Sequence, residues 1–526
     1  MDYNKFNRTN FIDRLKNSQF DIVIIGGGAT GLGIAIDASS RGLNTLLLEQ
    51  SDFAKGTSGR STKLIHGGIR YLKEGRFKLV FNALYERGIL LKNASHLVKK
   101  QSFIIPCYNI IDKWKYLIAL KVYDFLSGKL SLGKSQFIKK NEILQRIALK
   151  DSNKLIGGIE YFDARFDDSR LAINLARTAI EYGAILINYF KVTRLVKQNN
   201  IITGITAIDI ETSIKYNIAC KFVINATGVF VDDIINMDTP RAHNLVVPSQ
   251  GIHIVLKKDC LKSETALMIP STTDGRVLFA IPWYDRVLVG TTDEQTFSRD
   301  LEPVAHITEI EFILSNLNLY LKRSVSKEDI LSVFAGLRPL IAPKNIKKKS
   351  KEISRDHKLI VSKSGLITIT GGKWTTYRKM AEETVDKLFS IGNFTSKKCI
   401  TKKISIHGNS LNIIEGENSE YGSDKMELHK LINSDNYFKK CISSNCHFTI
   451  GHVIWAVKYE MARTVEDVLA RRCRLLFLDA AAAIEAAPLV AKVLADQLGF
   501  DDSWQKGQIA HFNEVARNYL VMSLKS

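Results

Sequence analysis

The chain has 526 residues, 45% apolar and 24% charged, with a formal net charge of +20. This length allows two or three domains, and the ordinary apolar content argues against wholesale disorder. Seven cysteines without a CxxC pair argue against a disulfide framework and favour a reducing cytoplasm. The positive charge fits a lysine-favouring AT-rich genome, an anionic substrate, or an anionic membrane or nucleic acid, and the scatter of the lysines favours the first of these.

The first twenty residues contain no continuous apolar core, so we expect no secretory signal. No run reaches the roughly 18–20 apolar residues of a membrane span. Any membrane contact is therefore expected to be peripheral.

The predicted elements begin with a strand, a glycine turn, a helix and a second strand over residues 20–50. Further along, the patterns predict a helical, basic region over 77–150 and an amphipathic helix over 167–184. A set of strands follows over 184–228, then a β-rich region over 245–293 and another helix over 306–322. Residues 365–389 again predict a strand, a Gly-Gly turn and a helix. A polar, irregular linker is expected over 395–447, and an Ala-rich helical domain from 449 onward.

The first glycine turn has the pattern G-x-G-x-x-G, with glycines at Gly26, Gly28 and Gly31. These positions suit a tight turn, close approach of a pyrophosphate, and close packing of helix on strand. Glu49 ends the second strand, where a carboxylate accepts hydrogen bonds from ribose hydroxyls. The context indicates a dinucleotide site, disfavours NADP, and leaves FAD and NAD open.

The next stretch, "FAKGTSGRSTKLIHGGIRYLK" (53–73), is rich in glycine, hydroxyl and cationic residues. Such a loop can wrap a long cofactor closely and offer N–H and hydroxyl donors to it. A solvated surface loop is the alternative. An NAD dehydrogenase would continue its alternation of strands and helices here, so FAD is favoured.

Four segments together resemble the FAD-dependent glycerol-3-phosphate dehydrogenases, within the D-amino-acid-oxidase-like flavoproteins. They are "GTSGRSTKLIHGGIRYL", "INATGVFVDDI", "GLRPL" and "GGKWTTYRKMAE". Phe230 stands where a Trp is common in the second segment. The resemblance covers residues 20–395 well and the C-terminal helical region moderately.

This resemblance implies an α/β fold in which a Rossmann-like FAD-binding domain is interleaved with a β-rich substrate domain and followed by an all-helical C-terminal domain. The expected oxidoreductase region spans 1–395, followed by a linker over 396–448 and the helical domain over 449–526. Within the first region, the FAD-binding domain is expected over 20–76, 150–245 and 355–395, and the substrate domain over 77–149 and 246–354.

The implied reaction oxidises sn-glycerol 3-phosphate to dihydroxyacetone phosphate, with hydride passing to flavin N5. Arg338, Lys373 and Arg70 are the candidate cations for the substrate phosphate, joined by Tyr71. His253 is the candidate base, with His66 as the other histidine considered, and a cation-rich pocket could also make a dedicated base dispensable. No metal site is expected. The expected FAD-binding residues are Gly26, Gly28, Gly31, Glu49, Thr57, Ser58, Ser61, Thr62, Lys63, His66, Gly67, Gly68, Gly228, Gly371, Gly372, Trp374 and Thr375.

The electron acceptor is a membrane quinone or oxygen, and we favour the quinone. Residues 113–134 mix Trp, Tyr, Leu and Lys as an interfacial segment does, although a helix packed on the substrate domain is the alternative. The lysine run over 344–355 is a solvated loop or a contact to anionic lipid. The expected location is the cytoplasm, peripheral on the inner face of the cytoplasmic membrane, and a homodimer is one option for the assembly.

Three other functions stay open at this point. They are a glycerol-3-phosphate oxidase that forms peroxide, an amine or amino-acid oxidising flavoenzyme of the same fold, and a nucleic-acid-binding protein. The last is disfavoured because no aromatic-interleaved basic motif is present.

Overall fold

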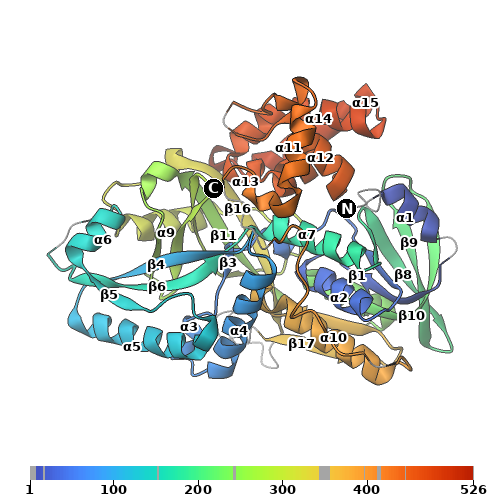
Figure 1. Ribbon diagram of the computed structural model, residues 1–526, viewed down its shortest axis with the longest axis horizontal. Coiled ribbons are helices and arrows are strands. Elements are labelled where there is room, and N and C mark those ends of the chain that lie inside the picture. Colours follow the sequence, from blue (N-terminus) through green and yellow to red (C-terminus); the bar gives the residue numbers. More distant parts are fainter. Residues whose placement is uncertain are drawn as a thin grey trace.

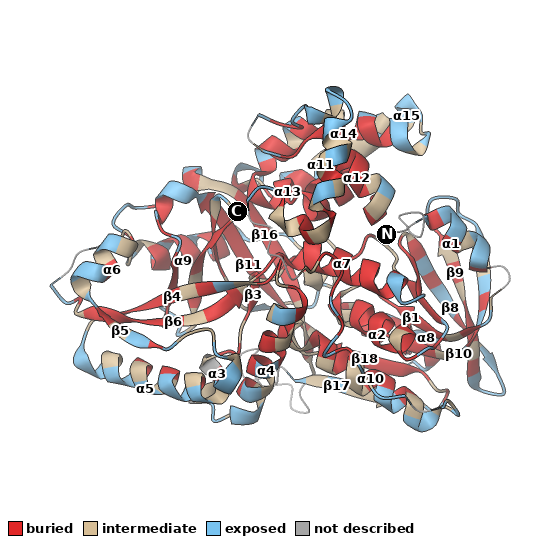
Figure 2. Cartoon of the chain, viewed as in Figure 1, coloured by how far each residue is buried: buried red, intermediate tan, exposed pale blue. Residues whose placement is uncertain are grey.

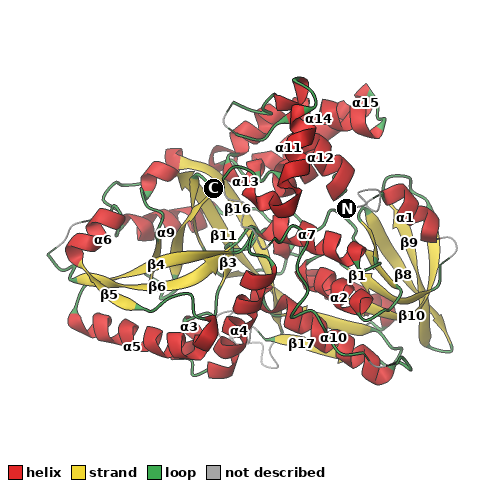
Figure 3. Cartoon of the chain, viewed as in Figure 1, coloured by secondary structure: helices red, strands yellow, loops and turns green. Residues whose placement is uncertain are grey.

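The computed structural model describes residues 7–15, 18–150, 153–240, 244–342, 356–395, 397–410, 416–444 and 446–524, without the side chains of Arg70 and Lys73. Two sheets lie beside each other, each covered by helices, and a helical unit sits across them (Figures 1 and 3). The lysine run at 344–355 lies outside the described residues.

The first sheet has eight strands among the described residues, with β17-β18-β10-β1-β2-β7 as its main order. β1 pairs in parallel with β2 and with β10, and β8 and β9 extend β10 as an antiparallel layer. Its strands are β1 (Phe20–Ile25), β2 (Thr45–Leu48), β7 (Ile185–Ile187), β8 (Phe190–Gln198), β9 (Ile201–Asp209), β10 (Lys215–Asn225), β17 (His357–Val361) and β18 (Ile367–Gly371).

The order of this sheet reverses direction at β1, because the chain runs from β1 to β2 and β7 on one side and places β10 and β18 on the other. Open parallel sheets bind ligands at such a point, beyond the carboxyl ends of the strands. β1 is almost wholly apolar and buried, as a strand covered on both faces must be. The helices α2 (Ala29–Ser40), α7 (Asp168–Glu181), α8 (Val231–Asp238) and α10 (Tyr377–Ile391) belong to this half.

The second sheet has ten strands, again counted among the described residues. The long antiparallel pair β11 and β16 forms one part of it, and the pair β4 and β6 forms another. Its strands are β3 (Leu64–Ile65), β4 (Lys99–Cys107), β5 (Gln136–Lys139), β6 (Gly157–Arg165), β11 (Val246–Lys257), β12 (Ala266–Ile269), β13 (Leu278–Trp283), β14 (Arg286–Gly290), β15 (Glu294–Gln295) and β16 (Ile330–Ile341). β3 and β6 join this sheet although their residues fall in the ranges expected for the cofactor domain.

Further helices cover the second sheet and form the C-terminal unit. Those near the second sheet are α3 (Arg70–Lys73), α4 (Phe77–Asn93), α5 (Ile110–Ser127), α6 (Lys140–Arg146) and α9 (Ile307–Asn318), while α1 (Arg8–Leu15) lies near β7. The C-terminal unit contains α11 (Lys425–Asn433), α12 (Ile450–Glu460), a π-helical turn (Asp467–Arg472), α13 (Leu475–Leu478), α14 (Ala480–Leu498) and α15 (Asp502–Arg517). Its core is continuous with Trp283 and Phe334 of the second sheet.

The expected fold class, an α/β cofactor domain interleaved with a β-rich domain and followed by a helical C-terminal domain, is confirmed. Two local predictions are wrong. Residues 77–150 are not all helical, because "SFIIPC" pairs as β4 with β6. Residues 395–447 are not wholly irregular, because Leu428 of α11 and Tyr421 are buried against Trp455 of α12.

The helices differ in how much of their surface is buried (Figure 2). α7 is buried along nearly its whole length, whereas α5 buries one stripe and exposes the other. Among the described helices, we find none with the length and hydropathy that crossing a bilayer requires.

Candidate active site

A cavity of about 590 Å³ opens at the reversal point of the first sheet. The ends of β1 and β10 contribute residues 25–26 and 226–228, and the end of β18 contributes Thr370 and Gly371. The walls also include residues 54–58 of the glycine-rich loop and Arg299, Asp300 and Leu301 from the second half of the molecule. The lining residues come from widely separated segments of the chain, from Ile25 to Trp374.

The shape of the glycine turn requires residues without a side chain at several positions. Gly26 has φ +109°, a conformation that favours glycine. A Cβ on Gly31 would lie 1.9 Å from the carbonyl oxygen of Gly26, so the helix approaches the strand only with glycine there. Gly28 caps α2 and lines the cavity. The amino end of α2, with its positive dipole end, therefore points into the cavity where a pyrophosphate fits.

Two oxygen acceptors already lie at this helix end. The amide of Ala29 donates to the Ser58 hydroxyl at 3.0 Å, and the amide of Gly27 donates to Glu49 Oε2 at 2.6 Å. Burial raises the pKa of Glu49, and the amides of Gly27 and Ser51 oppose that shift. Each carboxylate oxygen of Glu49 accepts one amide and keeps capacity for ribose hydroxyls.

The glycine-rich loop is fixed to both halves of the molecule. The hydroxyl of Thr57 donates to the carbonyl of Leu337 at 2.7 Å. The indole N–H of Trp374 donates to the carbonyl of Ser58 at 2.8 Å. Thr57, Ser58 and Trp374 all line the cavity, so the loop and the Gly371–Gly372 turn form one continuous wall.

The second part of the glycine-rich stretch supports the site rather than lining it. The Nζ of Lys63 lies 2.5 Å from Asp168 and 2.9 Å from the carbonyl of Gly59. Ser61 donates to the same carboxylate at 2.7 Å. Burial lowers the pKa of Lys63 to about 7, although Asp168 opposes the shift. Lys63 therefore points into the protein, and its cation is used internally.

A second glycine turn brings two predicted site residues together. Gly371 and Gly372 have φ +81° and +72°. The Nζ of Lys373 lies 4.0 Å from the ring centroid of Tyr71, in cation–π geometry. The hydroxyl of Thr375 donates to the carbonyl of His66 at 3.4 Å. The region 66–71 and the turn 371–375 thus meet, as a shared substrate pocket requires.

Arg338 lies on β16 in register with Ser249 of β11. Its guanidinium donates to Thr291 Oγ1 at 2.9 Å and to the carbonyl of Thr292 at 3.0 Å, and lies 3.4 Å from Asp293. A Cβ on Gly251 would lie 2.2 Å from Nη2 of Arg338, so the guanidinium occupies the space left by that glycine. Its Nη1 also donates to the carbonyl of Gln250 at 3.2 Å, and the side chain is 22% exposed.

His253 is buried on the same strand pair, opposite Phe334, and stacks on that ring at 5.0 Å. Its Nε2 lies 3.0 Å from Thr62 Oγ1. Its Nδ1 has no hydrogen-bond partner among the residues that the structure describes. Burial, together with the cations of Lys63 and Arg338, lowers the pKa of His253 well below its usual range, so the imidazole is neutral.

The predicted residues fall into two groups by position. Those that line the cavity are Gly26, Gly28, Glu49, Thr57, Ser58, Gly228, Gly371, Gly372, Lys373 and Trp374. Those that lie behind or beside its wall are Gly31, Ser61, Thr62, Lys63, His66, Gly67, Gly68, Tyr71, His253, Arg338 and Thr375. The side chain of Arg70 is outside the described part of the structure. Arg338 is nevertheless adjacent to the wall, because Pro339 lines it.

Several cavity residues were missed by the sequence reasoning. Phe190, Lys191 and Val192 come from the start of β8, and Arg299–Leu301 from the loop after β15. None of these segments carries a local motif, and only the topology brings them to the cavity. Lys55 and Gly56 could have been included, because they lie in the same glycine-rich stretch as Thr57 and Ser58.

Comparison with known proteins agrees with this site. A family model described as FAD dependent oxidoreductase matches residues 21–378, and one described as the C-terminal domain of alpha-glycerophosphate oxidase matches residues 365–505. A probable mitochondrial glycerol-3-phosphate dehydrogenase of Caenorhabditis elegans is 39% identical over 97% of this chain and 74% of that protein. The mitochondrial glycerol-3-phosphate dehydrogenase of Homo sapiens is 35% identical over 96% of this chain and 74% of that protein.

A solved structure shares the whole fold. The glycerol-3-phosphate dehydrogenase from Bacillus halodurans, complexed with FAD, covers 99% of both chains with a TM-score of 0.77 and 26% identity. The cavity of this chain is lined by the amino end of α2, the side chain of Glu49 and the Gly371–Gly372 turn. The chain therefore belongs to the FAD-dependent oxidoreductases and, within them, to the glycerol-3-phosphate dehydrogenase family.

Proposed function

We propose that the protein oxidises the C2 hydroxyl of sn-glycerol 3-phosphate to the ketone of dihydroxyacetone phosphate. The observation that carries the proposal is the near full-length identity of 39% to a glycerol-3-phosphate dehydrogenase, on a chain whose cavity has the features of a dinucleotide site. Bound FAD supplies the two-electron acceptor for the hydride that leaves C2. The hydroxyl proton goes to a base or to solvent. The hydride and this proton together account for both hydrogens that the alcohol loses.

The cations beside the cavity hold the substrate phosphate. Arg338 precedes the wall residue Pro339 and has a side chain that is 22% exposed, and Lys373 lines the cavity beside Tyr71. A guanidinium fork matches a phosphate in two hydrogen bonds, and a lysine adds a point charge. Gly371, Gly372, Trp374 and Thr375 form the turn that would face the reducible end of FAD.

His253 is the proposed proton acceptor, reached through the hydroxyl of Thr62. The neutral imidazole can take up a proton, and its Nε2 is within hydrogen-bond distance of Thr62 Oγ1. Burial, together with the nearby cations of Lys63 and Arg338, lowers the pKa of His253 and keeps the imidazole neutral, and the same cations favour an alkoxide on the substrate.

The electron acceptor in this proposal is a membrane quinone, and an exposed apolar face supports it. α5 exposes Ile111, Trp114, Ile118 and Phe125, from 53% to 83% of each residue. Adjacent α4 exposes Phe77 and Phe81, about half of each. Exposed lysines around this face are Lys78, Lys115, Lys129 and Lys134. Apolar and aromatic side chains ringed by lysines fit the interface of an anionic bilayer.

The proposed location follows from this face and is peripheral on an anionic membrane surface. The eukaryotic relatives are named mitochondrial. The proposal specifies an anionic membrane surface and does not specify an organelle.

Anaerobic titration of the purified protein with glycerol 3-phosphate tests the function. The flavin absorbance near 450 nm is expected to bleach stoichiometrically (about one substrate per flavin) as two electrons enter the cofactor. A 2-amino acid at the same concentration should leave the spectrum unchanged. Bleaching by the amino acid instead, or a protein that retains no flavin, would contradict the proposal.

Adding an electron acceptor to the reduced protein distinguishes a quinone from oxygen as the acceptor that the flavin uses. A short-chain quinone should restore the absorbance within seconds, and air should do so slowly with little peroxide. Rapid peroxide formation in air would make the protein a glycerol-3-phosphate oxidase.

A further inference from the structure

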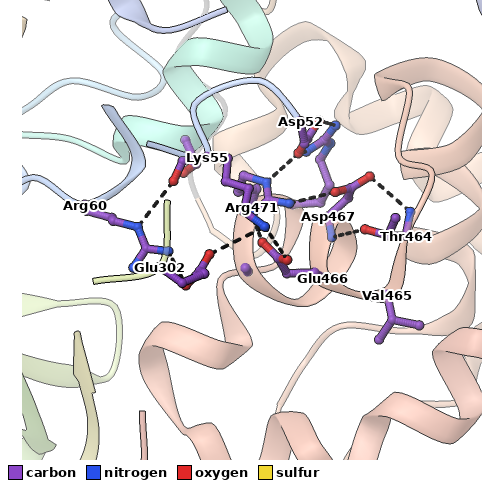
Figure 4. Close-up of polar contacts among 12 residues, drawn as sticks. Asp52, Lys55, Arg60, Glu302, Thr464, Val465, Glu466, Asp467 and Arg471 are labelled. Carbon is purple, nitrogen blue, oxygen red and sulfur yellow. Dashed lines mark hydrogen bonds and ion pairs between the residues drawn. The ribbon is translucent and has the colours of Figure 1, made fainter. Parts of the chain in front are cut away.

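The C-terminal unit contacts the wall of the cofactor cavity through buried ion pairs. We name residues 52–60 the cofactor loop and residues 464–474, which contain the π-helical turn, the clamp segment. Figure 4 shows the two segments facing each other, with Lys55 and Arg60 on one side and Glu466, Asp467 and Arg471 on the other. The clamp segment is about 400 positions away in the sequence.

The cofactor loop determines the shape of the cavity but has little to hold it in place by itself. Its residues 54–58 line the cavity, and Ser58 accepts the first amide of α2. Ala54 has φ +63°, which is unfavourable for a residue with a Cβ. Only Phe53 and Ala54 supply buried apolar side chains. Side-chain contacts from elsewhere must therefore fix its conformation.

The clamp segment holds the loop at three points. Asp52 accepts from Nε of Arg471 at 2.5 Å and from Arg472 at 2.6 and 3.0 Å. Lys55 donates to Glu466 at 2.7 Å. The carbonyl of Gly59 accepts from Arg474 at 3.1 Å.

These contacts are buried and interdependent. Asp52 and Arg472 are almost inaccessible, and Arg471 also pairs with Glu466 and Asp467, each at 2.6 Å. A buried charge that loses its partner is strongly unfavourable, because no water replaces the missing interaction. The loop and the clamp segment therefore adopt their observed positions together or not at all.

We infer that the clamp segment of the C-terminal unit is a positioning element for the cofactor loop, so that docking of this unit and binding of FAD are coupled. The inference rests on FAD occupying the cavity, as in the proposed function. Coupling of this kind is reciprocal: FAD stabilises the docked clamp segment, and a weakened clamp lowers the apparent FAD affinity.

A double-mutant cycle on Asp52 and Arg472 tests the inference in the full-length protein. Asp52→Asn keeps the shape of the side chain, lies outside the cavity lining, and leaves Arg472 with the more distant carboxylate of Glu460, at 3.7 Å, as its counter-charge. The dissociation constant for FAD, measured by fluorescence titration of the apoprotein, should rise at least tenfold. Asp52→Asn with Arg472→Gln should bind FAD more tightly than Asp52→Asn alone, because the buried cation that lost its close partner is gone.

Arg463→Ala is the matched control. Arg463 belongs to the same C-terminal unit and forms a bidentate pair with Glu211 of the cofactor half, at 2.8 and 2.7 Å, without touching the loop. It should leave the FAD dissociation constant within twofold of the wild-type value. An effect as large as that of Asp52→Asn would assign the change to general loosening of the units and overturn the inference.

Hydrogen exchange on the wild-type chain provides a test that needs no variant. Addition of FAD to the apoprotein should slow amide exchange across 464–474 and leave α15 unchanged. A wild-type protein that binds FAD without protecting the clamp segment would overturn the inference and spare the proposed function. A wild-type protein that binds no FAD at all would overturn both.

Discussion

At the residue scale, the site is built as much by absent side chains as by present ones. Gly251 is the main example, because its missing Cβ leaves the space that the guanidinium of Arg338 occupies. The neighbouring glycine across the strand pair, Gly336, gives similar room to Arg60. A cation can thus lie against a sheet whose own strands would otherwise exclude it.

Replacing Arg338 by Ala should raise the KM for glycerol 3-phosphate about 10- to 100-fold, because charge-assisted hydrogen bonds to the phosphate are lost. The flavin content should not change, since Arg338 does not line the cavity. Steady-state kinetics with a soluble quinone gives both constants. Arg338→Lys should be intermediate, because it keeps the charge and loses the fork. An unchanged KM in Arg338→Ala would remove the phosphate assignment.

Gly251→Ala should reproduce part of that effect with Arg338 still present. The new methyl group would overlap Nη2 of Arg338 and displace the guanidinium, so KM should rise several-fold. Gly507→Ala, where no atom lies within 4 Å of the added Cβ, is the matched control and should behave as wild type. Equal kinetics of the two variants would show that the position of the guanidinium does not matter.

His253→Gln should lower kcat about 10²- to 10⁴-fold and change KM little, if His253 accepts the proton. The glutamine keeps a hydrogen-bonding group near Thr62 but cannot take up a proton. A variant with wild-type kcat would instead favour proton release helped by the cations alone.

At the element scale, α5 has two apolar faces. Tyr116, Leu120 and Tyr123 are buried against the second sheet, while the opposite stripe is in solvent. A helix of a monomeric protein seldom exposes so much apolar surface without a partner. The packed helix considered as the alternative for 113–134 is therefore present over part of that range, and the interfacial contact predicted there stays a prediction for its exposed stripe.

Ile111→Glu with Phe125→Glu should abolish sedimentation of the protein with vesicles of phosphatidylcholine and phosphatidylglycerol. Two apolar side chains that would enter the bilayer are lost, and two negative charges are placed against an anionic surface. Leu319→Glu, at a residue 62% exposed elsewhere on the molecule, should sediment with the vesicles as the wild type does. Sedimentation of the double variant at the wild-type level would exclude this face as the membrane contact.

Elements with strong local signals could be predicted from the sequence, and the others could not. The strand, glycine turn and helix at 20–40 carry their own periodicity and turn residues, and the same holds for 365–389. β4 was missed because a short apolar run does not distinguish a strand from a buried helix segment. Its identity comes from pairing with β6, about fifty residues later.

The candidate site shows the same division. The glycine turns, Glu49 and the hydroxyl residues Thr57 and Ser58 could be predicted as site residues from motif and spacing, and they line the cavity. Lys63 could be recognised in the motif, but nothing in the local sequence indicates that Asp168 would take up its charge. The contribution of residues 190–192 and 299–301 depends on tertiary contacts alone.

At the scale of the whole molecule, several histidines are buried in the neutral state. Burial lowers the pKa of His96 and of His452 to about 3, with nearby cationic groups adding to the shift. His407 behaves in the opposite way: burial alone would lower its pKa, but hydrogen bonds to Asp424 and Glu181 outweigh it and raise the value. Lowering the pH therefore destabilises the folded state through His96 and His452 and stabilises it through His407.

The free energy of unfolding should fall as the pH drops below about 6.5. The unfolded chain then binds protons at His96 and His452 that the folded protein does not bind, which costs about 1.4 kcal/mol per pH unit for each residue. The contribution of His407 is present below about pH 6.5 and is lost as the pH rises through its raised folded pKa. Melting temperatures between pH 8 and pH 5 give the trend.

His452→Gln should reduce the slope of the melting temperature below pH 6.5, because one of the buried neutral histidines is gone. His511→Gln, on the exposed side of α15, should leave the slope unchanged. A His452→Gln slope equal to that of the wild type would show that His452 does not contribute to the acid sensitivity.

The wide spacing of the cavity lining along the chain has a consequence for biosynthesis. Residues from Ile25 to Trp374 meet in one wall, and the clamp segment that holds part of it ends at Arg474. A nascent polypeptide leaving the ribosome therefore cannot build a complete flavin pocket until translation has passed Arg474. Loading with the vitamin-derived cofactor should thus follow the synthesis of this residue, and riboflavin starvation should leave chains that extend beyond it, rather than shorter intermediates, as the species that proteases remove.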